Sequence, residues 1–307
     1  MDVHSHVDLG HSRPRIGSGE GGVMAPTRPL LRWHGGKWLL APWIISHFPP
    51  HRVYVEPFGG AASVLLRKPR SYAEVYNDLD DDVVNLFRVL RADPPENGHK
   101  LIDHLVHTPF ARKEFDDAYL LTDDPVEAAR RLIIRSFMGF GSDGHNGARP
   151  TGFRANSNRS GTTPAHDWSN YPDALERIIS RVSGVVIEHR PALDVIAQHD
   201  GPETLFYVDP PYMWATRSKA HNSSKKNYRH ELTDGDHEQL LDALCNVAGK
   251  VVLSGYDAPL YVERLSDWNR VERAALADGA RARTEVLWLN PAAAAGIASP
   301  TLFGAAA

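Results

Sequence analysis

The segment of this sequence with the clearest chemical potential is Asp209-Pro210-Pro211-Tyr212, which directly follows the apolar run 205–208. The two prolines fix the backbone and leave the Pro210 carbonyl without a competing local amide donor, so a carboxylate, a carbonyl and a ring are held in a fixed relation. The carboxylate and the carbonyl can accept both hydrogens of an exocyclic amine while the tyrosine stacks on the base. A structural Asp-Pro turn is the alternative. We favour the functional interpretation because this tetrapeptide is uncommon at the end of a buried strand.

A glycine turn, Glu56-Pro57-Phe58-Gly59-Gly60, stands between a predicted strand and a predicted helix. Glycines let a backbone approach a ligand closely, and open α/β sheets bind ligands at the carboxyl ends of their strands. The pyrophosphate fingerprint G-x-G-x-x-G is missing. Asp78, however, lies 22 residues after Glu56, at the end of the next strand, where a carboxylate can grip ribose hydroxyls. The pattern suits a nucleoside without a diphosphate, and an ordinary tight turn is the alternative.

A third segment, residues 32–38, reads Arg-Trp-His-Gly-Gly-Lys-Trp. It is not a P-loop, because Trp38 stands where that motif needs serine or threonine. What remains is an aromatic ring, a flexible turn and the cation of Lys37, which together can close over a nucleoside and pair with a carboxylate. A turn with a surface lysine explains the segment equally well.

An alternation of strand and helix patterns predicts the sheet that these motifs need. Such alternation is typical of βαβ units and a parallel sheet. The predicted strands are 52–56, 72–77, 185–188, 204–208 and 250–253, and the predicted helices between them are 61–67, 80–91, 192–198 and 234–247. The segments 270–274 and 284–289 predict an antiparallel hairpin at the sheet edge.

Residues 92–180 differ from this alternation. Helical patterns cover 97–107, 113–121 and 125–138, and the stretch 139–170 is dense in Gly, Asn, Ser, Thr and Arg. We predict a loop-rich, mainly helical inserted domain at 92–180, between two parts of a sheet domain at 27–91 and 181–290. Residues 1–26 are expected to be a disordered extension and residues 291–307 a loosely held Ala-rich tail.

The composition is that of an ordinary folded protein: 307 residues, 42% hydrophobic and 23% charged. The single cysteine, Cys245, excludes a disulfide-stapled secreted domain, and a reducing cytoplasm fits best. No apolar stretch approaches the roughly 18 residues of a membrane helix. We expect Cys245 to be a packed core thiol, because it shares a helical stretch with Leu240, Leu241 and Leu244.

The net charge of −4 gives no global reason to expect a nucleic-acid partner, but the distribution of charge is uneven. Between Arg130 and Arg159 there are six arginines and one acid, and between Met213 and His230 there are five cations and no acid. Solvated surface is the ordinary explanation of such runs. We keep both stretches as possible contacts with an anionic partner.

Taken in this order, the three motifs resemble those of the Dam-type adenine-N6 DNA methyltransferases, which use S-adenosylmethionine. Residues 33–37 are similar to the family's aromatic-Ala-Gly-Gly-Lys segment, residues 56–60 to its Glu-Pro-Phe-x-Gly segment, and Asn77-Asp78 to its Asn-Asp at the next strand end. The tetrapeptide 209–212 matches without change. Weaker similarity covers 135–140, 236–257 and 285–290. His34 departs from the family, which usually has a small residue there.

The resemblance implies a Rossmann-like methyltransferase sheet with helices on both faces, and an inserted domain that recognises the DNA target. It implies that Asp209, Pro210, Pro211 and Tyr212 hold a flipped adenine. The implied cofactor-binding residues are Trp33, Gly36, Lys37, Glu56, Phe58, Gly59, Asp78 and Asp209. The implied DNA-binding residues are Arg135, Arg149, Arg154, Arg159, Arg217, Lys225 and Lys226. These residues would contact phosphates and guanines. The affinity for DNA would then depend on the local basic face and not on the negative net charge of the whole chain.

The reaction expected from the resemblance is methyl transfer to adenine N6 in double-stranded DNA by direct displacement, without a metal, a membrane or a covalent enzyme intermediate. We expect a monomer. Methylation of cytosine N4 or of adenine in RNA, and a non-catalytic DNA-binding regulator on the same fold, are the alternatives. A restriction-modification system, strand marking for repair and a phage role all stay open.

Overall fold

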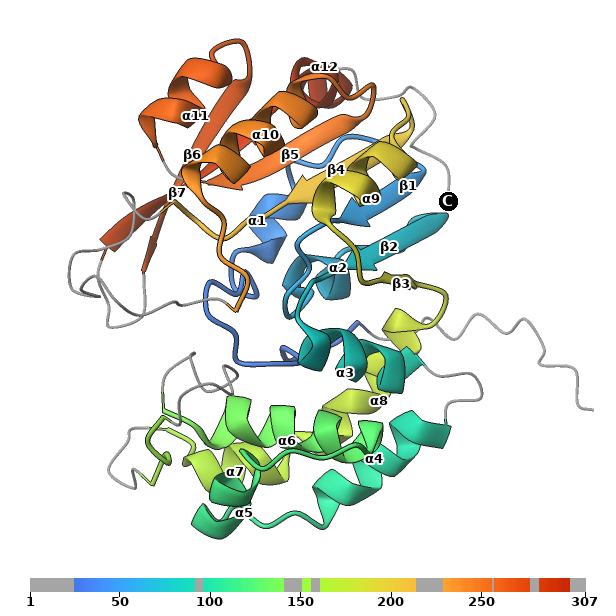
Figure 1. Ribbon diagram of the computed structural model, residues 1–307, viewed down its shortest axis with the longest axis vertical. Helices are drawn as coiled ribbons and strands as arrows, with labels where there is room; N and C mark the ends of the chain where they lie inside the picture. Colours follow the sequence, from blue (N-terminus) through green and yellow to red (C-terminus); the bar gives the residue numbers. More distant parts are fainter. Residues whose placement is uncertain are drawn as a thin grey trace, which may run out of the picture.

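A seven-stranded sheet forms the centre of the computed structural model (Figure 1). The structure describes residues 25–91, 96–140, 151–155, 161–213, 229–255, 257–276 and 282–298. The strands are β1 (Val53–Glu56), β2 (Ala73–Asn77), β3 (Val186–Glu188), β4 (Thr204–Val208), β5 (Lys250–Gly255), β6 (Asn269–Leu276) and β7 (Ala282–Leu289). Their spatial order is β3-β2-β1-β4-β5-β7-β6.

The pairing of the strands is parallel from β3 to β5 and antiparallel at β7 and β6. The chain runs outward from β1 through β2 to β3 and then returns to β4 on the other side of β1. The strand order therefore reverses between β1 and β4, and a crevice forms at the carboxyl ends of strands at such a switch point. The predicted parallel sheet and its antiparallel edge hairpin are confirmed.

Helices cover both faces of the sheet, as predicted. The helices are α1 (Ala41–Ile45), α2 (Ser63–Arg67), α3 (Asp81–Arg91), α4 (Glu96–Val106), α5 (Arg112–Asp117), α6 (Pro125–Met138), α7 (Pro164–Ser169), α8 (Pro172–Val182), α9 (Ala192–His199), α10 (Asp234–Cys245), α11 (Pro259–Arg264) and α12 (Pro291–Ala298). Along β4, Leu205 and Tyr207 belong to the hydrophobic cluster under α1, α2 and α3, whereas Phe206 and Val208 belong to the cluster under α9, α10 and α11. This alternation is that of a strand buried on both faces.

Helices α4 to α8 lie together at one end of the molecule, beyond the β3 edge of the sheet (Figure 1). Their apolar side chains are continuous with the cluster under α1 to α3. Leu30 and Leu31, from the segment before α1, are also buried in this cluster, and the Arg32 amide donates to Ser136 Oγ of α6 at 2.7 Å. The described helices of segment 92–180 therefore share one core with the sheet, and the predicted boundary at residue 180 falls inside α8.

Local sequence explains where several helices begin. Asp124 accepts hydrogen bonds from the Val126 and Glu127 amides at the start of α6, and Pro125 takes the first helical position. Thr233 and Asp236 form a reciprocal capping box at the start of α10. These caps place the helix starts within a residue of the predicted ones.

Two expectations about the carboxyl-terminal part differ from the structure. Residues Pro291–Ala298 form α12, whose Ala293 is buried, where a loosely held tail was expected. Asn290 anchors this helix, because its Oδ1 accepts from the Val251 and Ala293 amides. The expectation of a core thiol was wrong: Cys245 is exposed, since one residue beyond the buried Leu244 the helix has turned about 100° toward solvent.

A buried ion network fastens α8 to the sheet. The Arg181 guanidinium donates to both Glu74 carboxylate oxygens at 2.7 and 2.9 Å, and Lys68 Nζ donates to the same carboxylate at 2.7 Å. All three side chains are at most 6% exposed. The two cations hold the pKa of Glu74 below its ordinary value, although burial acts in the opposite direction. Charges removed from water in this way need their partners.

We predict that Glu74→Gln lowers the free energy of unfolding by about 3 kcal/mol, because it leaves two buried cations without a carboxylate. Equilibrium unfolding in urea measures this change. The matched control is Asp242→Asn, which breaks an exposed pair with Arg264 and should change stability by less than about 0.5 kcal/mol. Equal effects of the two substitutions would contradict the assignment of the Glu74 network as a fold-stabilising contact.

Candidate active site

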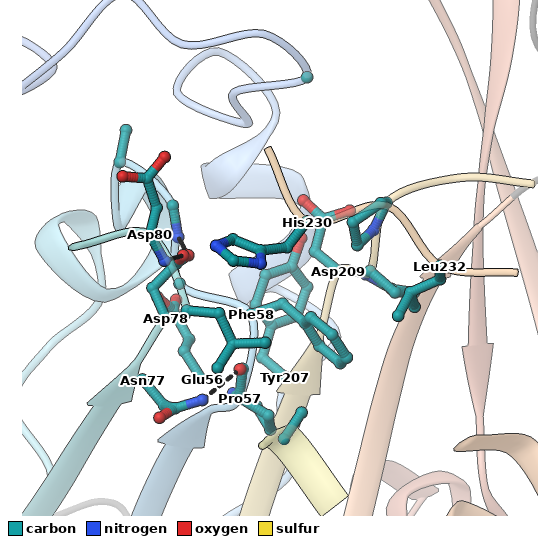
Figure 2. Close-up of a pocket in the computed structure, with 18 of the residues that line it drawn as sticks. Glu56, Pro57, Phe58, Asn77, Asp78, Asp80, Tyr207, Asp209, His230 and Leu232 are labelled. Atoms are coloured by element: carbon teal, nitrogen blue, oxygen red, sulfur yellow. Dashed lines mark hydrogen bonds between the residues drawn. The ribbon is translucent and has the colours of Figure 1, made fainter. Parts of the chain in front are cut away.

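A cavity of about 280 Å³ opens at the carboxyl ends of β1, β2 and β4, at the switch point of the sheet. Its wall contains all of the residues predicted to bind a cofactor, and Asp209, Pro210 and Pro211 of the predicted catalytic tetrapeptide. Figure 2 shows Glu56, Asp78, Tyr207 and Asp209 around this pocket. Three motifs that are up to 176 residues apart in the sequence, from Trp33 to Asp209, therefore meet in one place.

The glycine turn after β1 is shaped by two aromatic rings. A Cβ atom on Gly59 would lie 2.1 Å from the Tyr76 ring, and one on Gly60, whose φ is +47°, would lie 2.7 Å from Trp33 Nε1. The sequence reasoning attributed these glycines to close approach of a ligand. The structure gives a different reason: the Tyr76 and Trp33 rings occupy the space of the missing side chains, and Trp33 is itself part of the pocket wall.

Asp78 joins the ends of β1 and β2 to each other. Its two carboxylate oxygens accept hydrogen bonds from the Gly60 amide at 2.7 Å and the Asp80 amide at 2.8 Å. Burial raises the pKa of Asp78, and these backbone donors partly offset the effect. These hydrogen bonds fix the Asp78 carboxylate against the glycine turn in the pocket wall. This is the carboxylate that the sequence predicted to bind ribose hydroxyls.

The tetrapeptide after β4 is connected to the segment before α1. Lys37 Nζ lies 3.1 Å from Asp209 Oδ2, donates to the Gly35 carbonyl at 3.0 Å, and stands 4.8 Å from the centre of the Tyr212 ring. Tyr212 also hydrogen-bonds through its hydroxyl, at 3.2 Å to Asp209 and at 3.1 Å to Ser254. The Lys37 side chain is only 3% exposed and that of Asp209 18%. The carboxylate of the tetrapeptide is therefore fixed from two sides.

Glu56 is a buried carboxyl in the pocket wall. Its Oε1 accepts hydrogen bonds from the Tyr54 hydroxyl at 2.6 Å and from the Leu65 amide at 2.8 Å. Burial raises the pKa of Glu56 to about 7, against the opposing effect of these two donors. The protonation of this group is consequently sensitive near neutral pH.

The segment that follows residue 228 contributes to the other side of the pocket. His230 and Leu232 line it, and Arg229 Nη1 lies 3.0 Å from Asp80. Figure 2 shows His230 near Asp78 and Asp80. Sequence reasoning counted Arg229 only as part of a basic run. Neither its charge nor its neighbours in the sequence identify Asp80, just before α3, as its partner.

Arg135 and Arg154 are the predicted DNA-binding residues that the structure describes. Arg135 is 7% exposed, and its guanidinium donates to Asp82 at 3.0 Å and to the Ala118 carbonyl at 2.7 Å. This placement argues against contact with DNA, because the side chain is used to join α6 to α3. Arg154 is half-buried and donates to the Phe137 carbonyl at 2.9 Å. Five further predicted contacts, Arg149, Arg159, Arg217, Lys225 and Lys226, lie outside the described residues.

Comparison with known proteins gives the context of this geometry. Residues 33–278 match the model of the D12 class N6 adenine-specific DNA methyltransferase family. The chain belongs to this family. It is similar to a DNA adenine methylase of Escherichia coli strain K12 (25% identity over 195 residues, 62% of this chain and 66% of the relative). It is also similar to the type II methyltransferase M1.LlaDCHI of Lactococcus lactis subsp. cremoris (25% over 259 residues, 79% and 86%).

A shorter match has higher identity. A DNA adenine methylase of Vibrio cholerae is 35% identical over 77 residues, which is 25% of this chain and 27% of the relative. The chain thus covers only about a quarter of that relative's length in the match. The family membership confirms the resemblance drawn from the three motifs, and the observed sheet is consistent with a Rossmann-like methyltransferase fold.

The described residues contain neither a metal-binding cluster nor a membrane-spanning helix. Within these ranges, no three His, Cys, Asp or Glu side chains gather in the way that a bound metal ion needs. No described helix combines the length and the apolar character required to cross a membrane.

We predict that Glu56 makes stability depend on pH in a defined window. Because folding raises the pKa of this carboxyl from about 4.5 to about 7, the folded chain binds the proton more tightly than the unfolded chain between these values. The wild type should therefore lose stability relative to Glu56→Gln as the pH rises from 4.5 to 7, and the difference should level off above that. Glutamine keeps an oxygen for the Tyr54 and Leu65 donors.

Urea unfolding of both proteins at pH 5, 6, 7 and 8 measures this difference. A difference that does not change between pH 5 and pH 8 would contradict the raised pKa of Glu56. Glu238→Gln, at an exposed position of α10, is the control for the loss of a carboxylate and should show no such trend.

Proposed function

We propose that this chain transfers the methyl group of S-adenosylmethionine to the N6 amino group of a flipped adenine in a specific double-stranded DNA sequence. The observation that carries the proposal is the shared cavity: the glycine turn and Asp78 form one part of its wall, and Asp209 and Pro210 form another. A nucleoside-binding turn and an amine-binding clamp within one cavity allow a cofactor and a base to be held in reach of each other.

The residues of the cavity suit the cofactor. Among its described lining residues are four aspartates, Asp78, Asp80, Asp209 and Asp236, and two cations, Lys37 and Arg229. An acidic wall favours a ligand with positive charge on a sulfonium and an ammonium group. Trp33 and Phe58 add aromatic surface for an adenine ring. The residues proposed to hold the cofactor are Trp33, Gly36, Lys37, Glu56, Phe58, Gly59, Asp78 and Asp209.

Asp78 has the position and the rigidity for ribose recognition. Each of its oxygens accepts one backbone hydrogen bond and keeps further acceptor capacity for the ribose hydroxyls. Lys37 fixes the Asp209 carboxylate, so the distance between the nucleoside end of the cavity and the clamp does not depend on a flexible loop.

The clamp acts on the adenine amino group. Asp209 and the Pro210 carbonyl would accept its two hydrogens, Pro211 keeps that backbone rigid, and Tyr212 would stack on the base. The bound cofactor supplies an electrophilic methyl group on a positively charged sulfur. Asp209 and the Pro210 carbonyl would direct the N6 lone pair at this methyl carbon, so that the carbon–nitrogen bond would form as the carbon–sulfur bond breaks. The Asp209 carboxylate would then pass one N6 proton to water. The acidic wall stabilises the positive charge that N6 carries before it loses the proton.

Recognition of the DNA is assigned to the helical segment 92–180 and to the basic run 213–230. Arg149, Arg154, Arg159, Arg217, Lys225 and Lys226 are proposed to contact phosphates and base edges. Arg135 is left out of this set because of its burial between α3 and α6.

We predict that Asp209→Ala reduces methyl transfer to duplex DNA by at least about 1,000-fold, because it removes the acceptor that orients and stabilises the reacting amine. Transfer of labelled methyl from S-adenosylmethionine to mixed-sequence duplex DNA measures the loss. Unfolding in urea checks that the variant is folded, since Lys37 retains the Gly35 carbonyl as a partner.

Asp267→Ala is the matched control, because it removes an exposed carboxylate of the same sheet domain away from the cavity. It should leave transfer within twofold of the wild type. Activity of Asp209→Ala near the wild-type level would overturn the role of the clamp, and no transfer by the wild type would overturn the proposed function.

A further inference from the structure

The Tyr207 hydroxyl is a buried polar group without a partner among the described residues. Its side chain is 3% exposed, and the residue lines the cavity. Every other buried tyrosine of the described chain has a hydroxyl partner: Tyr54 with Glu56, Tyr76 with the Gly60 carbonyl, Tyr171 with the Leu30 carbonyl, and Tyr261 with His237. Tyr207 is thus the exception among the buried tyrosines of the described residues, and it belongs to the wall of the cavity.

The strand register places Tyr207 beside the acidic wall of the pocket. β1 and β4 pair Val55 with Phe206, so Glu56 and Tyr207 are the next residues along the two strands. Figure 2 shows both near the carboxyl ends of these strands. The Tyr207 ring packs in the cluster under α1 and α2, with its centre 5.9 Å from that of Phe48. The ring is therefore held by packing and does not need the hydroxyl for its position.

Tyr207 is a hydrogen-bond donor at any physiological pH. Burial raises the pKa of its hydroxyl well above the ordinary value, the negative charge of Asp209 raises it further, and Lys37 lowers it. A buried donor without a partner is unfavourable, whereas a phenylalanine of the same shape has no such cost. A tyrosine at this position is explained when a ligand accepts its hydrogen bond.

We propose that the Tyr207 hydroxyl donates a hydrogen bond to the methionyl carboxylate of bound S-adenosylmethionine. This inference rests on the proposed function. The glycine turn and Asp78 form the part of the pocket suited to the nucleoside, whereas Tyr207 lies in the electrostatic neighbourhood of Lys37 and Asp209. The cofactor's amino-acid part carries acceptors for such a donor in its carboxylate oxygens, and Lys37 supplies positive charge in the same neighbourhood.

Tyr207→Phe and Tyr171→Phe form the test, measured on the full chain by urea unfolding without ligand and by calorimetric titration with S-adenosylmethionine. Tyr207→Phe should leave the ligand-free protein as stable as the wild type or more stable, and weaken S-adenosylmethionine binding about tenfold. Tyr171→Phe, which loses a 2.6 Å hydrogen bond to Leu30, should lower stability and leave the dissociation constant within twofold, because neither residue lines the cavity.

5′-Methylthioadenosine, which lacks the amino-acid part of the cofactor, locates the contact. Its affinity, measured by competition with S-adenosylmethionine, should be the same within twofold for the wild type and Tyr207→Phe. If Tyr207→Phe weakened the binding of both ligands equally, the hydrogen bond could not be assigned to the carboxylate.

Unchanged S-adenosylmethionine affinity of Tyr207→Phe, or a loss of ligand-free stability as large as that of Tyr171→Phe, would overturn the inference and leave the proposed function intact. A wild-type chain that does not bind S-adenosylmethionine would instead count against the proposed function itself.

Discussion

The contact between Lys37 and Asp209 is the interaction on which the site depends. An ammonium group that is only 3% exposed needs a charged or polar partner, and Asp209 provides it at 3.1 Å. The contact joins the segment before the first strand to the carboxyl end of β4, which the sequence separates by 172 residues. It orients the Asp209 carboxylate from a segment far away in the sequence. The Asp209 carboxylate therefore has a fixed orientation in the ligand-free protein.

A second set of charges connects the pocket to the helical part of the molecule. Arg229 lies 3.0 Å from Asp80 and 3.1 Å from Asp82, and Asp82 also accepts from Arg135 of α6. Asp80 lines the pocket, while Arg135 reaches the Ala118 carbonyl beyond α5. The pocket wall and the helices α5 and α6 are thus joined by a continuous series of contacts.

The strands and the central motifs could be predicted from the sequence because their signals are local. The five residues of β4 are apolar or β-branched throughout, and the predicted boundaries 204–208 are those of the structure. Asp209 is the next residue in the chain, so it must lie at the carboxyl end of β4. Helix α8 was missed although residues 174, 175, 178, 179 and 182 form a clear apolar stripe: no element was predicted between the polar stretch that ends at residue 170 and the strand that begins at residue 185.

Partners that lie far away in the sequence were not predictable. Arg135 was expected to contact DNA because it belongs to an arginine-rich stretch and because of the family resemblance, but its environment is set by Asp82, 53 residues earlier. The orphaned hydroxyl of Tyr207 is likewise visible only when the neighbours of each atom are known. The sequence shows that a charged group or a hydroxyl is present. The role of that group depends on the tertiary contacts that provide its hydrogen-bond or ion-pair partners.

Analysis of the modified nucleosides tests the central claim most directly. Mixed-sequence duplex DNA is incubated with the wild-type chain and methyl-labelled S-adenosylmethionine, digested to nucleosides and separated by chromatography. The account predicts label in N6-methyldeoxyadenosine. Label in N4-methyldeoxycytidine, or no labelled nucleoside from a folded protein that binds the cofactor, would contradict it.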